Sequence, residues 1–128
     1  MTYVWIALGG ALGSVARFAL ASFFARRFGE NFPWGTIFVN VSGSFLIGVL
    51  AALSESGGKL ASSVMLQRFL VVGICGGYTT FSAFSVQTLG LMRSGHMLAA
   101  GLNVMVSVLA CLIAVWLGHL LGAAVRGQ

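Results

Sequence analysis

The sequence predicts an all-α membrane protein whose subunit has four transmembrane helices. Hydrophobic residues make up 59% of the 128 positions and charged residues only 7%, so the chain has too little polar surface to cover a soluble domain of this size. It contains four apolar runs, each about 20 residues or longer, the length of helix that spans a bilayer. Basic and turn-forming residues collect between these runs, as they do at membrane interfaces.

The first predicted span covers residues 4–24. Gly9 and Gly13 are four apart in it, a spacing of small residues that lets two helices pack closely. Arg17 follows one turn later and lies deep enough that it must snorkel, pair or face water. Arg17 is therefore a candidate vestibule residue that attracts anions.

The second predicted span covers residues 34–53. Asn40, Ser44 and Gly48 are four apart and share one helical face. An asparagine inside a membrane is costly unless it finds a partner. Asn40 and Ser44 are candidates for a donor-lined route, and hydrogen bonding to a neighbouring helix is the alternative.

The third predicted span, residues 69–92, contains the uncharged stretch GICGGYTTFSAFSVQ. Gly76 and Gly77 weaken a helix and two β-branched threonines follow them, which predicts a break near the middle of the span. A break frees backbone groups that protein, water or an ion must then satisfy. If two antiparallel copies met at a two-fold axis, carbonyls from both breaks would converge on one point that suits a cation. The alternative is an unbroken helix with a Gly73-xxx-Gly77 packing face.

Two phenylalanines and two serines follow the predicted break. Phe81 and Phe84 share one helical face, and Ser82 and Ser85 form a neighbouring stripe of hydroxyls. Because an aromatic ring has a positive edge, ring edges and hydroxyl donors together make an electropositive surface without a charge. This combination is typical of a site for a small anion, whereas ordinary packing is the alternative for the rings alone.

The fourth predicted span covers residues 97–124. Asn103 and Ser107, four apart, add polar side chains to the proposed route. Gly118 and Gly122 repeat the close-packing pattern of the first span. Hydrogen bonding between helices is again the alternative for Asn103.

Four spans place both chain ends on the same side of the membrane. The basic residues outside the spans divide equally between the sides, with Lys59, Arg68 and Arg126 facing Arg26, Arg27 and Arg93. Since an excess of basic residues normally sets orientation, this balance predicts insertion in both orientations and an antiparallel, dual-topology homodimer. The scattered basic residues, with no run longer than two, argue against nucleic acid as a partner.

The predicted spans contain no Asp, Glu or Lys, because Glu30, Glu55 and Lys59 fall in the connections. Proton-coupled exchange normally uses an intramembrane carboxylate or a similar group, so a passive pathway is favoured over an exchanger. His96 lies in a connection and His119 near the C-terminus. No nucleophile and base cluster in the sequence pattern, and we expect no enzymatic activity.

The motifs GGALGSVARF, PWGTIFVNVSGSFLIG and above all GGYTTFSAFS resemble those of the Fluc/CrcB fluoride channels over nearly the whole chain. The resemblance implies an antiparallel homodimer with two fluoride pores, each built from both subunits. It implies that Phe81, Phe84 and Asn40 border fluoride and that a polar track is formed by Thr80, Ser82, Ser85 and Ser107. It also implies that carbonyl oxygens of Gly76 and Thr79, doubled by the dimer axis, hold a structural sodium ion.

Two positions depart from the family pattern. Ala83 stands where a hydroxyl residue is common, and Asn103 stands where a tyrosine often lies. The expected function is a passive, fluoride-selective channel that exports fluoride down its electrochemical gradient across the cell (inner) membrane, with membrane lipid around it. A fluoride/proton exchanger and a membrane subunit without a transport role are the alternatives.

Overall fold

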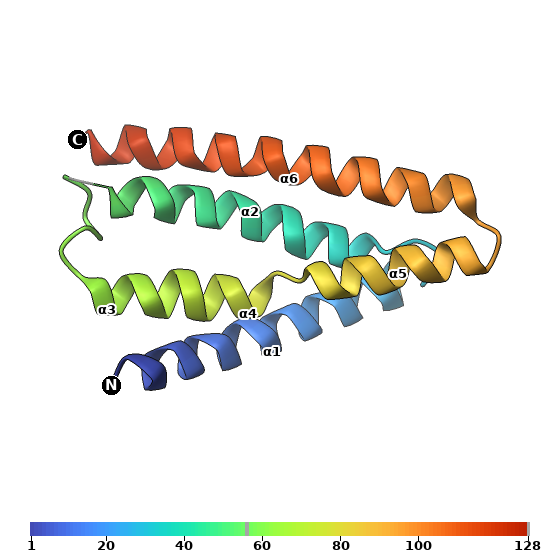
Figure 1. Cartoon of the computed structure of the whole chain (residues 1–128), viewed down its shortest axis with the longest axis horizontal. Helices are drawn as coiled ribbons and strands as arrows, with labels where there is room; N and C mark the ends of the chain where they lie inside the picture. Colours follow the sequence, from blue (N-terminus) through green and yellow to red (C-terminus); the bar gives the residue numbers. More distant parts are fainter. Residues whose placement is uncertain (56, 128) are drawn as a thin grey trace.

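The computed structural model, which describes residues 1–55 and 57–127, is a bundle of four long helical rods with both termini at one end (Figure 1). The first, second and fourth rods are α1 (Thr2–Phe28), α2 (Trp34–Ser54) and α6 (Met97–Arg126). The third is segmented into α3 (Val64–Gln67), the π-helical η1 (Arg68–Cys75), α4 (Gly76–Tyr78) and α5 (Phe81–Arg93). The predicted all-α, four-span subunit is confirmed.

All four rods are long and apolar enough to cross a membrane, so the chain is a multi-pass membrane protein. They extend beyond the apolar runs from which the spans were predicted. For example, α1 continues through Arg26 and Arg27 and ends at Phe28, just before Gly29, whose φ is 79°. The helices continue into the polar interface because their backbone hydrogen bonds do not depend on apolar side chains.

Glycines bring α1 directly against the third rod. A Cβ atom on Gly9 would lie 2.5 Å from the Phe69 carbonyl oxygen and 3.0 Å from the Gly73 Cα. A Cβ atom on Gly77 would lie 2.5 Å from the Gly10 carbonyl oxygen. The two glycine rows that the sequence predicts as packing faces therefore lie against each other within one chain.

Glycines also join α2 to α6, which lie side by side (Figure 1). A Cβ atom on Gly48 would collide with the Val115 carbonyl oxygen, and one on Gly118 would collide with the Phe45 carbonyl oxygen. Most large apolar side chains of α6 point outward and are exposed, as lipid-facing residues are. Backbone contact at small residues thus joins these rods, beside a small apolar core around Leu50, Leu60 and Cys75.

Candidate functional site

The third rod is broken at two threonines. Thr79 has a ψ of 156°, and Thr80 has a φ of −152° and a ψ of 113°, so both are extended between α4 and α5. Figure 1 shows this linker as the point at which the rod changes direction. The predicted break is confirmed, and the alternative of an unbroken helix is wrong.

Asn40 of α2 bonds to both backbone groups of Thr80 at the break. Its Nδ2 donates to the Thr80 carbonyl oxygen at 3.0 Å, and its Oδ1 accepts from the Thr80 amide at 2.8 Å. The break frees the Thr80 amide, whereas the carbonyl of Thr80, the N-cap residue of α5, also accepts the first bond of that helix. Asn40 therefore satisfies one freed group and adds a second bond to the carbonyl. The asparagine predicted to face a pathway therefore also holds the break in place.

Arg17 of α1 meets another freed backbone group. Its Nε donates to the Gly77 carbonyl oxygen at 3.0 Å, and the Ser14 hydroxyl is 3.5 Å from the same oxygen. In an unbroken helix this carbonyl would accept from Phe81, four residues later. The structure therefore places Arg17 against the break, and its role in a vestibule stays a prediction.

The two residues whose carbonyls are predicted to hold a cation lie at the two ends of α4, which begins at Gly76 and is followed by Thr79. The Thr80 amide bonds to Asn40 instead of to the Gly76 carbonyl, and the Thr79 amide donates to the Cys75 carbonyl at 3.0 Å. The Thr79 hydroxyl donates to that Cys75 oxygen as well, at 2.9 Å. The Gly76 carbonyl is thus released from its helical partner. Because the Thr79 hydroxyl already bonds to Cys75, the carbonyl is the Thr79 group that remains available to a cation.

A groove of about 350 Å³ lies beside the break, between α2, α5 and α6. It brings together five of the residues predicted to form an anion pathway, and Ser44 and Thr79 lie on it too. The Phe81 and Phe84 rings are 5.2 Å apart between centroids, with their planes at 49°. The five predicted residues on the groove are Asn40, Thr80, Phe81, Phe84 and Ser107.

The remaining two track residues lie on the exposed face of α5 and are not among those that line the groove. The Ser82 hydroxyl is 3.2 Å from that of Thr80, and the Ser85 hydroxyl donates to the Phe81 carbonyl at 2.9 Å. Phe81 itself is 77% exposed. A ring and two hydroxyls therefore lie on a face that no other part of the described chain covers.

A polar residue that the sequence analysis missed joins α5 to α6. Thr88 is buried, donates to the Phe84 carbonyl at 2.7 Å and accepts from Asn103 Nδ2 at 2.8 Å. Ser107 in turn donates to Asn103 Oδ1 at 3.3 Å. Thr88 follows Phe84 by four residues and Phe81 by seven, so helical spacing could have placed it on the face of the rings.

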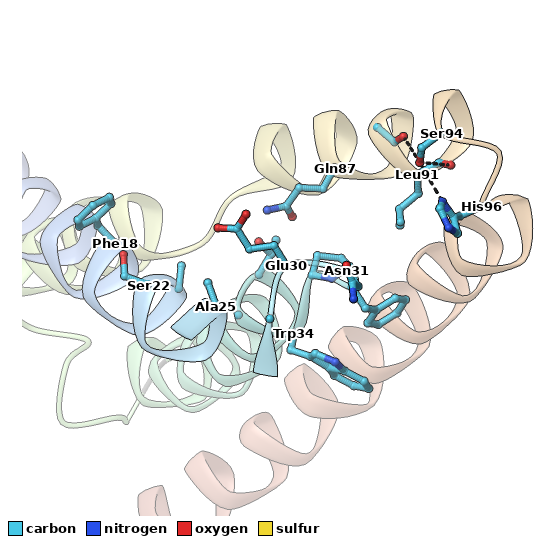
Figure 2. A pocket seen from close by; sticks show the side chains of 17 residues that line it. Phe18, Ser22, Ala25, Glu30, Asn31, Trp34, Gln87, Leu91, Ser94 and His96 are labelled. Atoms are coloured by element: carbon cyan, nitrogen blue, oxygen red, sulfur yellow. Dashed lines mark hydrogen bonds between the residues drawn. The ribbon is translucent and has the colours of Figure 1, made fainter. Parts of the chain in front are cut away.

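A second, larger cavity of about 860 Å³ opens between the end of α1, the α1–α2 connection and α5. Figure 2 shows Glu30 from the connection and Gln87 from α5 on this cavity, together with the hydrogen bond between Ser94 and His96. The Ser94 hydroxyl and His96 Nδ1 are 3.0 Å apart. The residues around this cavity include none of those predicted for the pathway or the cation.

An ion cluster lies at the end of the bundle that holds the termini. The Glu55 carboxylate contacts His119 Nε2 at 2.9 Å and also pairs with Arg126. The hydrogen bonds from Arg126 and His119 lower the pKa of Glu55 below its ordinary value of 4.5. The cluster ties the end of α2 to the C-terminal part of α6, and Glu55 itself lies just outside the membrane-spanning α2.

Comparison with known proteins gives a family match over most of the chain. A family model described as "CrcB-like protein, Camphor Resistance (CrcB)" matches residues 4–119. A protein of Methylocella silvestris is 50% identical over 126 residues, covering 98% of this chain and 96% of its own. Proteins of Opitutus terrae (53% over 118 residues; 92% and 89%) and Rhodospirillum rubrum (50% over 119 residues; 93% and 92%) are similarly close. All three are named fluoride-specific ion channel FluC.

Proposed function

Because this chain belongs to the CrcB-like protein family, we propose that it is a fluoride-selective ion channel, the activity for which its relatives are named. The observation that carries the proposal is the groove beside the break. This groove is lined by five residues that sequence pattern and family resemblance assign to an anion pathway.

The groove offers an anion polar contacts without a fixed positive charge. Among the described residues on its walls, Asn40, Thr80 and Ser107 carry amide or hydroxyl donors, and Phe81 and Phe84 have ring edges of positive potential. A small, strongly hydrated anion needs such contacts to replace its water. A full positive charge would hold it too tightly for rapid passage. This balance favours conduction over storage of the ion.

A second, antiparallel copy of the chain would complete the site. The exposed α5 face carries Phe81, Ser82 and Ser85, and hydroxyls against lipid hydrocarbon are unfavourable. A homodimer interface at this face would bury them and line a route with residues of both copies. Adding several lysines at one end of the chain should force a single orientation and abolish flux. Coexpression of a copy biased to the opposite orientation should restore the flux. Full conduction by the single-orientation protein would refute this assembly.

The residues at the break fit a structural sodium ion, whose preferred ligands are oxygens. The carbonyls of Gly76 and Thr79 are the candidate ligands, and a two-fold axis would double them to four. A bound sodium would supply positive charge that fixes the two breaks against each other. Thr79→Ser should retain the ion because the backbone binds it, whereas a bulky residue at Gly76 should lose it. Isomorphous ion substitution that reveals only water at the dimer centre would contradict the assignment.

The proposed transport is passive export from the cytoplasm across the inner membrane. An inside-negative potential drives an anion outward by about 2.3 kcal/mol per 100 mV. Glu30 and Glu55, which could otherwise carry protons, lie in the connections rather than in the membrane spans. The pathway therefore needs no coupled proton.

The function is tested by fluoride release from liposomes that contain the purified protein. A channel should release fluoride when a potassium ionophore dissipates the membrane potential, without any protonophore, and should release far less chloride. Phe81→Ile and Phe84→Ile keep apolar bulk but remove the ring edge, so each should lower fluoride flux per folded dimer. Fluoride release that occurs without the potassium ionophore and follows a proton gradient would indicate an exchanger and refute the channel.

A further inference from the structure

The side chains of Ser107, Asn103 and Thr88 form a hydrogen-bonded chain that ends on the Phe84 carbonyl. We name these three side chains the relay. Asn103 is only 1% exposed, and Thr88 and Ser107 are also buried. The relay begins at the groove, which Ser107 lines, and ends at the backbone of the second groove ring. Its contacts determine which groups an ion in the groove can use.

Hydrogen bonding determines the orientation of the Asn103 amide. The single Thr88 hydroxyl hydrogen is donated to the Phe84 carbonyl at 2.7 Å, so the Thr88 oxygen can only accept from Asn103. Asn103 therefore turns Nδ2 toward Thr88 and Oδ1 toward Ser107. Ser107 must then donate its own hydrogen to Asn103.

This orientation leaves the Ser107 oxygen without a hydrogen for the groove. Its lone pairs alone would face an anion there and repel it. At 3.3 Å, however, the bond from Ser107 to Asn103 is the longest in the relay, beside 2.8 and 2.7 Å for the other two. The weakest link is thus the one nearest the groove, and a hydroxyl rotates readily about its C–O bond.

We propose that Asn103 is a specificity-determining residue, because it competes with the permeating anion for the Ser107 hydroxyl hydrogen. The inference rests on the proposed channel function. An anion recruits Ser107 only if its own hydrogen bond exceeds the one that Ser107 gives up. Fluoride is the smaller halide and approaches a donor more closely than chloride does, so its attraction to the hydrogen is stronger. When Asn103 is removed, fluoride recovers the whole cost of breaking the Ser107–Asn103 bond, whereas chloride gains only its own weaker bond. Asn103 therefore limits the preference for fluoride.

Thr88 is a positioning residue in this scheme, since it acts through Asn103. By accepting from Nδ2 it keeps Oδ1 turned toward Ser107. A serine at this position would retain that function, whereas a valine of the same shape would leave the amide free to turn its Nδ2 to Ser107. The competition for the serine hydrogen would then be relaxed.

The test compares fluoride and chloride flux in liposomes for the wild-type protein and Asn103→Leu, which keeps similar volume without an acceptor. We expect the fluoride-to-chloride ratio to rise by up to about two- to tenfold, the factor that one neutral hydrogen bond contributes. Thr88→Val should raise the ratio as well, and Thr88→Ser should keep it. These two variants carry the test if Asn103→Leu does not fold.

A double variant separates the relay from simple packing. Once Ser107→Ala has removed the contested hydrogen, adding Asn103→Leu should leave the ratio unchanged. A purely structural Asn103 would instead affect both backgrounds equally, and that result would overturn the proposal. An unchanged ratio in folded Asn103→Leu would overturn it as well.

A binding measurement in detergent does not depend on flux. The side-chain amide resonance of Asn103 should shift saturably with sodium fluoride but not with sodium chloride, and Ser107→Ala should abolish the shift. Equal shifts with both salts, or none, would contradict the competition. If the wild-type protein released no fluoride at all, the channel proposal would fail and this inference with it. Normal wild-type flux, with a fluoride-to-chloride ratio that the Asn103 and Thr88 variants do not change, would refute the relay alone.

Discussion

Removing the Asn40 side-chain amide should destabilise the break in the third rod. Asn40→Leu keeps a side chain of similar size but leaves the Thr80 amide and carbonyl without the bonds of 2.8 and 3.0 Å that they now make. The Thr80 amide is then left unsatisfied, which costs about 1–3 kcal/mol. The Thr80 carbonyl still accepts the first bond of α5 and loses only an additional bond, of about 0.5–1.5 kcal/mol. Because Thr80 lines an open groove that water can enter, we expect about 2–3 kcal/mol.

Two other variants calibrate this loss. Asn40→Asp, as a carboxylate, still accepts from the Thr80 amide but cannot donate to the Thr80 carbonyl, so it should retain only one of the two bonds. Ser44→Ala changes the next residue along the same face of α2 and the same groove without touching the break. We therefore expect Ser44→Ala to be close to wild type.

The assay is thermal unfolding in detergent, followed by a thiol-reactive dye at Cys75. This thiol is 1% exposed and lies one turn before the break, so it reacts when the rod opens. Cys111, which is only half-buried, is replaced by alanine in every sample. Equal unfolding temperatures for Asn40→Leu and Ser44→Ala would refute the view that Asn40 holds the break.

Two further predictions concern helix packing and the ion cluster. Gly9→Ala should destabilise the protein by several kcal/mol because its Cβ meets backbone at 2.5 Å. Gly10→Ala has nothing within 4 Å of the added atom, so it should be neutral or stabilising by about 0.5–1 kcal/mol. Unfolding in detergent measures both, and equal effects would contradict the packing. The lowered pKa of Glu55 stabilises the folded state above the ordinary value of 4.5, and this contribution should disappear as the pH falls below it through the folded-state pKa. The unfolding temperatures of wild type and Glu55→Gln should therefore differ at pH 7 and converge in acid, and a constant difference would show that Glu55 protonation is not involved.

Local patterns predicted much of this fold. Runs of apolar residues located the rods because a helix needs about 20 such residues to span a bilayer. Glycines spaced four apart located the contacts between rods because small residues on one helical face let two backbones approach closely. The break could be predicted because Gly76, Gly77 and the threonines weaken a helix whatever surrounds it. Five of the seven predicted pathway residues line one groove. Helical spacing accounts for the shared face of Phe81 and Phe84 alone, and the family resemblance supplied Thr80.

Long-range pairing could not be predicted in the same way. Asn40 and Thr80 are 40 residues apart in sequence, and Arg17 and Gly77 are 60 apart. Which polar groups meet depends on how far each rod slides and rotates against its neighbours. Thr88 was missed for this reason, since a lone threonine gains its role only when Asn103 is opposite it. The π-helical turns of η1 also had no clear signal in residue type.

The side chains that satisfy the break come from the two rods that precede it in the chain. Arg17 belongs to α1 and Asn40 to α2, so the ribosome completes both before it makes Gly77 and Thr80. The freed backbone groups of the third rod can therefore find their partners as soon as that rod leaves the insertion machinery, without a period in bare lipid. A permuted chain that begins with the third rod should insert less efficiently, as measured by the fraction integrated during translation. The order of the helices thus makes a segment that is poorly suited to the bilayer on its own compatible with biogenesis one helix at a time.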